Sequence, residues 1–365
     1  MERTQINALL TAQRTFFREG HTHDISFRIN ALKALYSALE SRESEISDAL
    51  RLDLGKSAFE SYMCEVGMVK SEISYMLRHI KSLAREKAVP SPLAQFPSRS
   101  FVRPSPLGCC LIMSPWNYPL LLTLGPMVDA IAAGNTVILK PSNYAPNTAE
   151  CIRSIISSLY APEHITVVTG GREENGALLE LPFDHIFFTG SKAVGKVVME
   201  AASKHLTPVI LELGGKSPCI VDHTCDLKLA AKRIVFGKFL NCGQTCVAPD
   251  YIYCRRSVAA PLAKYIKEEI ARQFGQHPLE NENYGKIISE KHYSRLKGLL
   301  STGNITHGGV CDDSALRIEP TLMEGCRWGD PIMAEEIYLS GLIGRWLKSL
   351  RLFLKKFRML EFRSR

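Results

Sequence analysis

The chain has 365 residues, of which 45% are hydrophobic and 22% are charged, a composition typical of a folded two-domain protein rather than a disordered one. The formal net charge is +8, but residues 339–365 contribute +7, with eight Lys and Arg residues against one Glu, and residues 1–338 carry only +1. Because most of the chain is nearly neutral, the charge excludes a broad basic surface for nucleic acid.

Cysteine usage and the N-terminal segment bear on the cellular compartment. The eleven cysteines contain no Cys-x-x-Cys pair, and the odd count favours reduced thiols over a disulfide framework. Cys242 and Cys246 lack the second ligand pair that a zinc site requires, so we expect no metal. The first twenty residues, MERTQINALLTAQRTFFREG, lack the apolar core of a signal peptide. We therefore expect a cytoplasmic protein.

The N-terminal part of the chain, residues 5–90, has helical patterns. Leu32, Leu35 and Leu39 share one apolar stripe, and a second helix is predicted from about residue 59 to about residue 85.

From residue 105 onward, short apolar runs alternate with amphipathic segments. This alternation predicts an α/β fold with a parallel sheet covered by helices on both faces. Such sheets bind ligands at the carboxyl ends of their strands. A second α/β unit is expected to begin near residue 207. Strands are predicted at residues 109–113, 135–140, 165–170, 185–190, 208–213 and 218–222, and helices at 119–133, 145–159 and 192–205.

Two strand ends carry residues suited to a nucleotide. After the run HIFFTG, Gly190, Ser191 and Gly195 open a predicted helix, where a phosphate could approach backbone N–H groups. The spacing is not G-x-G-x-x-G, and taken alone it fits slightly better a turn that lets the helix pack on the strand. Lys140, at the end of another strand, could bind a ribose or could be a surface lysine. Together the two features favour a dinucleotide.

The segment LNCGQTCVAPDYI, residues 240–252, offers a candidate nucleophile. Cys242 and Cys246 lie in a polar turn with Gly243, where nearby N–H groups could stabilise a thiolate or an oxyanion. Both could equally be ordinary buried cysteines, and the spacing does not choose between them.

Two further polar residues lie in apolar surroundings. Glu212, in LELGGKSP, could be a general base whose pKa is raised by burial, or it could pair with Lys216. Asn117, in SPWNYP, could donate to an oxyanion, although a turn asparagine is the simpler interpretation.

Taken together, these segments resemble the aldehyde dehydrogenase family from about residue 27 to residue 338. HLTPVILELGGKSPC and AAKRIVFGKF are most similar to the class 3 branch, which acts on medium-chain, fatty and aromatic aldehydes. The resemblance implies a Rossmann-like NAD(P)-binding domain over residues 1–206 and an α/β catalytic domain over 207–338 that is incomplete at its C-terminus. The matching segments, in order, are SPWNYPL, AAGNTVILKPS, FDHIFFTGSKAVGK, LELGGKSP, GKFLNCGQTCVAPDYI and AEEIY.

The resemblance also assigns roles to individual residues. It makes Cys246, rather than Cys242, the nucleophile that forms a thiohemiacetal and then a thioester with the aldehyde. It makes Asn117 the oxyanion donor and Glu212 the base that activates water for hydrolysis to the acid. NAD or NADP would accept the hydride. The residues assigned to the cofactor are Trp116, Lys140, Gly190, Ser191, Gly195 and Glu336.

Two departures from the family pattern modify these expectations. Asn143 replaces a glutamate that binds the adenosine ribose in many relatives, so we expect NADP to be used at least comparably to NAD. Cys242 could form a reversible disulfide with Cys246, although a bystander thiol is the favoured interpretation.

After Tyr338 the chain no longer follows the family pattern. Residues 339–365 place Trp346, Leu350 and Phe357 on one helical face and basic residues on another, which predicts a basic amphipathic helix. Such a helix could contact an anionic membrane surface, whereas the favoured interpretation is an out-of-frame or alternative-exon end without a selected role. The family is homodimeric, and part of its dimer-forming region would be missing. The alternative function is a non-catalytic truncated product that binds the cofactor or a full-length partner.

Overall fold

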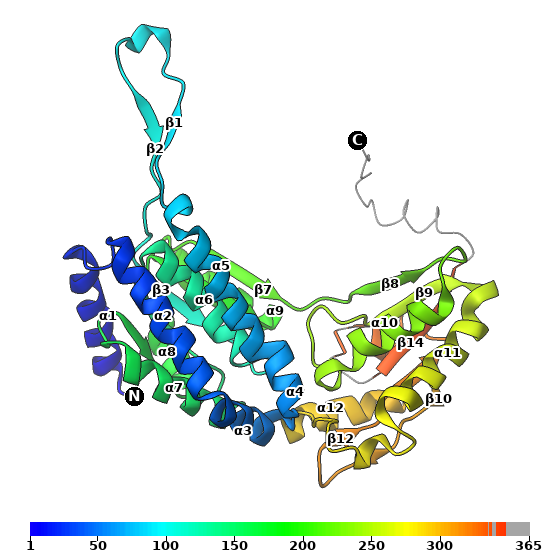
Figure 1. Ribbon diagram of the computed structural model, residues 1–365. Coiled ribbons are helices and arrows are strands. Elements are labelled where there is room, and N and C mark those ends of the chain that lie inside the picture. Colours follow the sequence, from blue (N-terminus) through cyan, green and yellow to red (C-terminus); the bar gives the residue numbers. More distant parts are fainter. Residues whose placement is uncertain (335, 338–340, 348–365) are drawn as a thin grey trace. The chain divides into compact units, whose positions relative to one another are not determined.

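The computed structural model describes residues 1–334, 336–337 and 341–347, which form two compact units (Figure 1). The first unit comprises Met1–Asp53 and Ala58–Leu213, and the second comprises Leu54–Ser57 and the described residues from Gly214 onward. The division follows Leu213 rather than residue 206, because strand β7 (Val209–Leu213) pairs with a strand of the first unit.

The first unit contains a sheet of five parallel strands in the order β5-β4-β3-β6-β7. The predicted parallel-sheet α/β fold is therefore confirmed. The chain leaves β3 toward β4 and β5, and it then returns to the other side of β3 with β6. In open α/β sheets, the point where the strand order reverses in this way is where ligands bind. The strands are β3 (Cys109–Met113), β4 (Thr136–Lys140), β5 (Ile165–Val167), β6 (His185–Gly190) and β7.

Apolar clusters cover both faces of this sheet. Leu111 and Ile138 pack in one cluster with residues of α1, α8 and α9, and Ile112 and Val137 pack in the other with residues of α2, α5, α6 and α7. Alternation along a strand sends neighbouring side chains to opposite faces. The helices of this unit are α1 (Arg3–Arg18), α2 (Ile25–Ser41), α3 (Glu43–Leu54), α4 (Ala58–Ser61), the π-helix η1 (Tyr62–Val66), α5 (Gly67–Leu83), α6 (Leu121–Ala133), α7 (Pro146–Leu159), α8 (Arg172–Leu179) and α9 (Lys192–Ser203).

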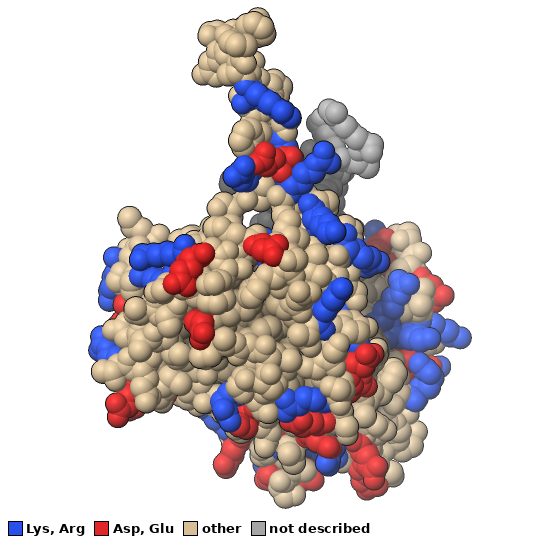
Figure 2. All heavy atoms as spheres, turned by 60° about the vertical axis from the view of Figure 1, so that its left-hand side comes forward, with Lys and Arg blue, Asp and Glu red and all other residues tan. Residues whose placement is uncertain are grey.

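An antiparallel hairpin that the sequence did not predict extends from this unit (Figure 1). It is formed by β1 (Lys87–Val89) and β2 (Ser100–Val102), with the short 3-10 helix η2 (Leu93–Gln95) between them. Charged side chains of both signs are interspersed over large uncharged areas on the face shown in Figure 2.

The second unit contains a five-stranded sheet in the order β10-β13-β14-β9-β8, in which β10 is antiparallel to β13 and the other pairs are parallel. The strands are β8 (Pro218–Val221), β9 (Tyr251–Arg255), β10 (Asn304–His307), β13 (Thr321–Glu324) and β14 (Gly341–Leu347). The remaining elements are helices α10 (Leu227–Phe239), α11 (Arg256–Phe274), α12 (Glu290–Leu300) and α13 (Pro331–Ala334), the 3-10 helices η3 (Leu240–Gly243) and η4 (Pro278–Glu280), and strands β11 (Cys311–Asp312) and β12 (Arg317–Ile318).

The prediction of a helix over residues 339–365 is wrong for Gly341–Leu347, because these residues form strand β14, which pairs with β9 and β13. Pairing with two neighbouring strands outweighs the helical spacing of the local sequence. The rest of the expected helix lies outside the described residues. Within the part of the chain that the structure describes, no helix combines the length and the apolar character needed to span a bilayer.

Candidate functional site

Seven of the nine predicted site residues belong to the first unit, at or next to the carboxyl ends of its strands. Asn117 follows β3, Lys140 ends β4, Gly190 ends β6, and Glu212 lies near the end of β7. The sheet register brings these ends to one edge, since Met113 of β3 is paired with both Lys140 and Phe188. Trp116 precedes Asn117, Ser191 follows Gly190, and Gly195 lies in the first turns of α9.

The loop that carries Asn117 is fixed by buried polar groups. The Thr123 hydroxyl donates to the Pro119 carbonyl at 2.6 Å and lies 2.5 Å from the Ser114 hydroxyl. The backbone N–H of Ser114 donates to the carbonyl of Lys140 at 3.2 Å. Asn117 itself is only 4% exposed, so its amide is held within the fold rather than in a solvated turn.

A residue that the sequence analysis missed, Glu65 of η1, anchors the far end of this loop. Its carboxylate is fully buried and accepts from the backbone N–H groups of Leu120, at 2.8 Å, and Leu121, at 3.1 Å. The first N–H groups of a helix have no partner within that helix, and a negative charge there is favourable. Glu65 thus caps α6. An acidic residue within the run YMCEVGMV was the available sequence signal.

Lys140 is buried, which excludes the interpretation as a surface lysine. Its Nζ donates to the carbonyls of Gly170, at 2.7 Å, and Pro141, at 3.0 Å. Burial lowers the pKa of Lys140 to about 8, and the charge of Glu174 partly opposes this shift. Because an ammonium group can donate three hydrogen bonds, Lys140 can also accommodate a ligand oxygen.

The glycine turn after β6 has both a packing role and a suitable geometry for an anion. A Cβ at Gly190 would lie 2.6 Å from the Phe188 ring, and one at Gly195 would lie 2.8 Å from Leu213, so packing alone requires both glycines. Ser191 caps α9 by accepting from the N–H of Val194 at 3.3 Å. The first residues of α9 are exposed. An exposed helix N-terminus at the carboxyl edge of a parallel sheet fits the pyrophosphate of a dinucleotide.

Glu212 lies on β7, the edge strand, and is exposed. The burial expected from its leucine neighbours is therefore absent in this structure, and Leu213 is likewise 37% exposed. Lys216, the alternative partner considered for Glu212, instead forms an ion pair with Asp250 at 3.2 Å.

The second unit carries Cys246 on the loop that follows η3. The turn before it is unusual, because Asn241 and Cys242 have φ values of 53° and 54°, in the left-handed region, and Gly243 follows with φ 78°. Non-glycine residues adopt this conformation only where the surroundings hold it. Cys242 is buried in an apolar cluster, whereas Cys246 is partly exposed.

Gln244, which the sequence analysis did not single out, holds this turn from within. Its fully buried side chain donates to the carbonyls of Asn241, at 3.0 Å, and Lys286, at 3.1 Å, and it accepts from the N–H of Ile288 at 3.0 Å. A buried amide with three hydrogen bonds strongly constrains the backbone that it joins. Gln244 therefore fixes the start of the Cys246 loop.

Glu336, the last of the predicted cofactor residues, also belongs to the second unit, where it is partly buried and precedes Ile337. The N–H of Ile337 donates to Asp250 at 3.1 Å. Over the described residues, no group of three or more His, Cys, Asp or Glu side chains is arranged to hold a metal ion.

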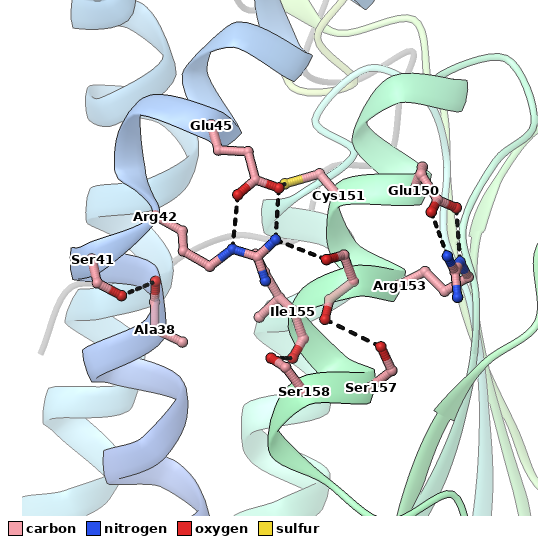
Figure 3. Close-up of polar contacts among 11 residues, drawn as sticks. Ala38, Ser41, Arg42, Glu45, Glu150, Cys151, Arg153, Ile155, Ser157 and Ser158 are labelled. Carbon is pink, nitrogen blue, oxygen red and sulfur yellow. Dashed lines mark hydrogen bonds and ion pairs between the residues drawn. The ribbon is translucent and has the colours of Figure 1, made fainter.

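Several other cysteines are held as unreactive thiols. The thiol of Cys151 lies 3.7 Å from Glu45, and Arg42 donates to both oxygens of that carboxylate (Figure 3). Burial, together with the charge of Glu45, raises the pKa of Cys151 to about 12. Burial likewise raises the pKa of Cys110 to about 12. Since the thiolate is the reactive form, neither cysteine competes as a nucleophile near neutral pH.

A family model, curated relatives and a solved structure all match this chain to the same family. The model of the aldehyde dehydrogenase family matches residues 1–340. The 4,4'-diaponeurosporen-aldehyde dehydrogenase of Staphylococcus aureus (strain NCTC 8325 / PS 47) is 45% identical over 327 residues, which are 89% of this chain and 71% of that protein. Aldehyde dehydrogenase family 3 member B1 of Bos taurus is 45% identical over 325 residues, 89% of this chain and 69% of that protein. The structure of the substrate-bound state of Staphylococcus aureus AldH has a TM-score of 0.94 and 42% identity, covering 97% of this chain and 78% of that one.

Proposed function

The chain belongs to the aldehyde dehydrogenase family, and on this premise we propose which residues carry its reaction and which aldehydes it accepts. It is similar to class 3 members and is an oxidoreductase that converts an aldehyde to a carboxylic acid with NAD or NADP. The alternative of a non-catalytic product is not favoured, because the family match extends over residues 1–340.

We propose that the substrate is an apolar aldehyde, either medium-chain, fatty or aromatic. The support comes from the resemblance to class 3 enzymes and from a relative at 45% identity that is named for 4,4'-diaponeurosporen-aldehyde.

In this proposal, Cys246 is the nucleophile. Its thiol gives its proton to solvent water, its sulfur bonds to the aldehyde carbon, and the carbonyl oxygen becomes the oxyanion of a thiohemiacetal. The Asn117 amide and the backbone N–H of Cys246 stabilise that oxygen. The observation that carries this choice is the difference in exposure between the two cysteines, since Cys246 is partly exposed and Cys242 is packed in an apolar cluster.

The cofactor, when bound, supplies the acceptor for the hydride that leaves the former carbonyl carbon. The pyrophosphate is assigned to Gly190, Ser191 and Gly195, and a ribose to Lys140, whose Nζ lies at the carboxyl end of β4. Glu336 is assigned to the nicotinamide ribose, and Trp116 to a position close to the cofactor.

Hydrolysis releases the product. Glu212 takes a proton from a water molecule, whose oxygen attacks the thioester carbon, and the Cys246 thiolate leaves. Glu212 is exposed to water in this structure, which suits a group that recruits a water molecule.

Asn143 supports use of NADP at least comparable to that of NAD. It lies in the exposed turn after β4, with its side-chain amide close to Gly171. Because this amide is neutral, it brings no negative charge toward a 2′-phosphate.

We further propose that the enzyme is cytoplasmic and forms a homodimer, as its family does.

The test is an initial-rate assay on the purified chain with octanal or benzaldehyde and either NAD or NADP, followed by absorbance of the reduced cofactor. Cys246→Ser should lower kcat by about 10³-fold or more, as expected for loss of a nucleophile. Cys242→Ser is the matched control and should retain most of the activity. Equal loss in both variants, or activity that survives in Cys246→Ser, would exclude Cys246 as the nucleophile.

A further inference from the structure

Asp250 is a buried carboxylate at the end of the loop that carries Cys246. It is 2% exposed, and two lysines meet it: Lys238 at 3.1 Å and Lys216 at 3.2 Å. Lys238 is itself fully buried. A buried charge is stable only with partners, so these three side chains constrain one another.

The same carboxylate and its partners hold the backbone on both sides of Glu336. Asp250 Oδ2 accepts from the N–H of Ile337 at 3.1 Å, and Lys216 Nζ donates to the carbonyl of Ile332 at 2.7 Å. The carbonyl of Ile337 accepts from Arg295 of α12 at 2.8 Å. The peptide groups on both sides of Ile337 are therefore fixed by charged side chains.

Asp250 is also tied to the start of the neighbouring strand β8 through its own backbone. Its N–H donates to the carbonyl of Ser217 at 2.9 Å, just before β8, and β9 begins at the next residue. Burial lowers the pKa of Lys238, and the charges of Asp250 and Glu336 oppose that shift, which places Glu336 in the same electrostatic cluster.

We propose that Asp250 is a positioning residue, which holds Glu336 in register with the loop that carries Cys246. The inference rests on the proposed function, from which the roles of Cys246 and Glu336 are taken. Asp250 touches neither substrate nor cofactor. It acts by fixing the main chain next to Glu336 through the N–H of Ile337, while Arg295 fixes the carbonyl of Ile337.

The proposal requires that cofactor binding, rather than folding alone, respond to these residues. Asp250→Asn leaves two buried ammonium groups with a neutral partner and could unfold the unit, so Arg295→Ala is the second variant. Arg295 is exposed, which makes its removal compatible with folding. Lys297→Ala is the matched control, since Lys297 is exposed on the same helix and pairs with Asp313 at 2.7 Å.

The experiment uses the full chain. Titration with NAD and NADP, followed by tryptophan fluorescence, gives the dissociation constant of the cofactor, and initial rates give KM for cofactor and aldehyde. Asp250→Asn and Arg295→Ala should each raise the cofactor Kd about tenfold, the effect of losing one hydrogen bond to a charged group, and should change the aldehyde KM less. Lys297→Ala should match the wild type.

The Glu336→Gln variant tests whether Asp250 and Arg295 affect cofactor binding through Glu336. If Asp250 and Arg295 act through Glu336, then Arg295→Ala combined with Glu336→Gln should raise the cofactor Kd by less than the product of the two single effects. A wild-type Kd in folded Arg295→Ala, or multiplicative effects in the double variant, would overturn the proposal.

Failure of the proposed function can be distinguished from failure of the positioning role of Asp250. A chain that binds the cofactor but reduces none of it with any aldehyde would refute the function, while the Kd shifts would still decide the positioning role. A chain that binds no cofactor would refute both.

Discussion

The cap that Glu65 provides to α6 gives a quantitative prediction about the loop that carries Asn117. Glu65 accepts from two buried backbone N–H groups, those of Leu120 and Leu121. In Glu65→Ala each donor loses a charged acceptor at a cost of about 1–2 kcal/mol. The lost interaction with the helix N-terminus adds about 0.5–1 kcal/mol. We therefore expect the first unit to lose about 2.5–5 kcal/mol of unfolding free energy. Glu65→Gln keeps a neutral acceptor and should lose about 1 kcal/mol.

Urea denaturation measures the loss, and amide hydrogen exchange locates it. The amides of Leu120 and Leu121 should exchange faster in Glu65→Ala than in the wild type, with Glu65→Gln intermediate. Glu200→Gln, an exposed position on α9, is the control and should change neither quantity. A Glu65→Ala variant within about 0.5 kcal/mol of the wild type, with unchanged exchange at both amides, would refute the assigned cap, because an exposed substitution typically has an effect of that size.

Three further predictions follow from the same two units. Gln244→Ala removes three buried hydrogen bonds and should lower the unfolding free energy by about 3 kcal/mol and lower kcat; a stable variant with wild-type kcat would contradict the role of Gln244 in fixing the Cys246 loop. The pKa of Lys140 is lowered from 10.5 to about 8 by burial, so the unfolded chain binds more protons between these values. Stability of the wild type relative to Lys140→Met should therefore rise as pH increases from 8 toward 10.5, measured as the difference in Tm, and a flat or falling difference would contradict it. Asn143→Glu should raise KM for NADP about tenfold or more relative to KM for NAD, because the new carboxylate repels the 2′-phosphate. An unchanged ratio of the two KM values would exclude Asn143 as the determinant of cofactor selectivity.

Local patterns in the sequence predicted the parallel sheet well. The strands β3 and β4 are apolar runs that are buried on both faces throughout, and turn residues mark their ends. Because strand ends of a parallel sheet meet at one edge, the grouping of Asn117, Lys140 and Gly190 followed from the order of the elements alone.

Features that depend on contacts between distant segments could not be predicted in this way. Glu65 reaches residues 120 and 121, and Asp250 reaches Ile337, and neither pairing leaves a local pattern. Residues 341–347 have helical spacing, yet they form β14 because two strands flank them. The exposure of Glu212 follows from the position of β7 at a sheet edge, which the leucines beside it do not indicate.

The central claim, that the sulfur of Cys246 bonds to the aldehyde carbon, can be tested by trapping the acyl-enzyme. The chain is mixed with aldehyde and NADP, quenched in acid within one turnover, and digested with trypsin. Residues 239–255 form one peptide that contains Cys242, Cys246 and Cys254, so fragmentation must locate the added mass. We predict an acyl group on Cys246 alone. An acyl group on Cys242 or Cys254, or acid formation with an unmodified peptide, would contradict the mechanism.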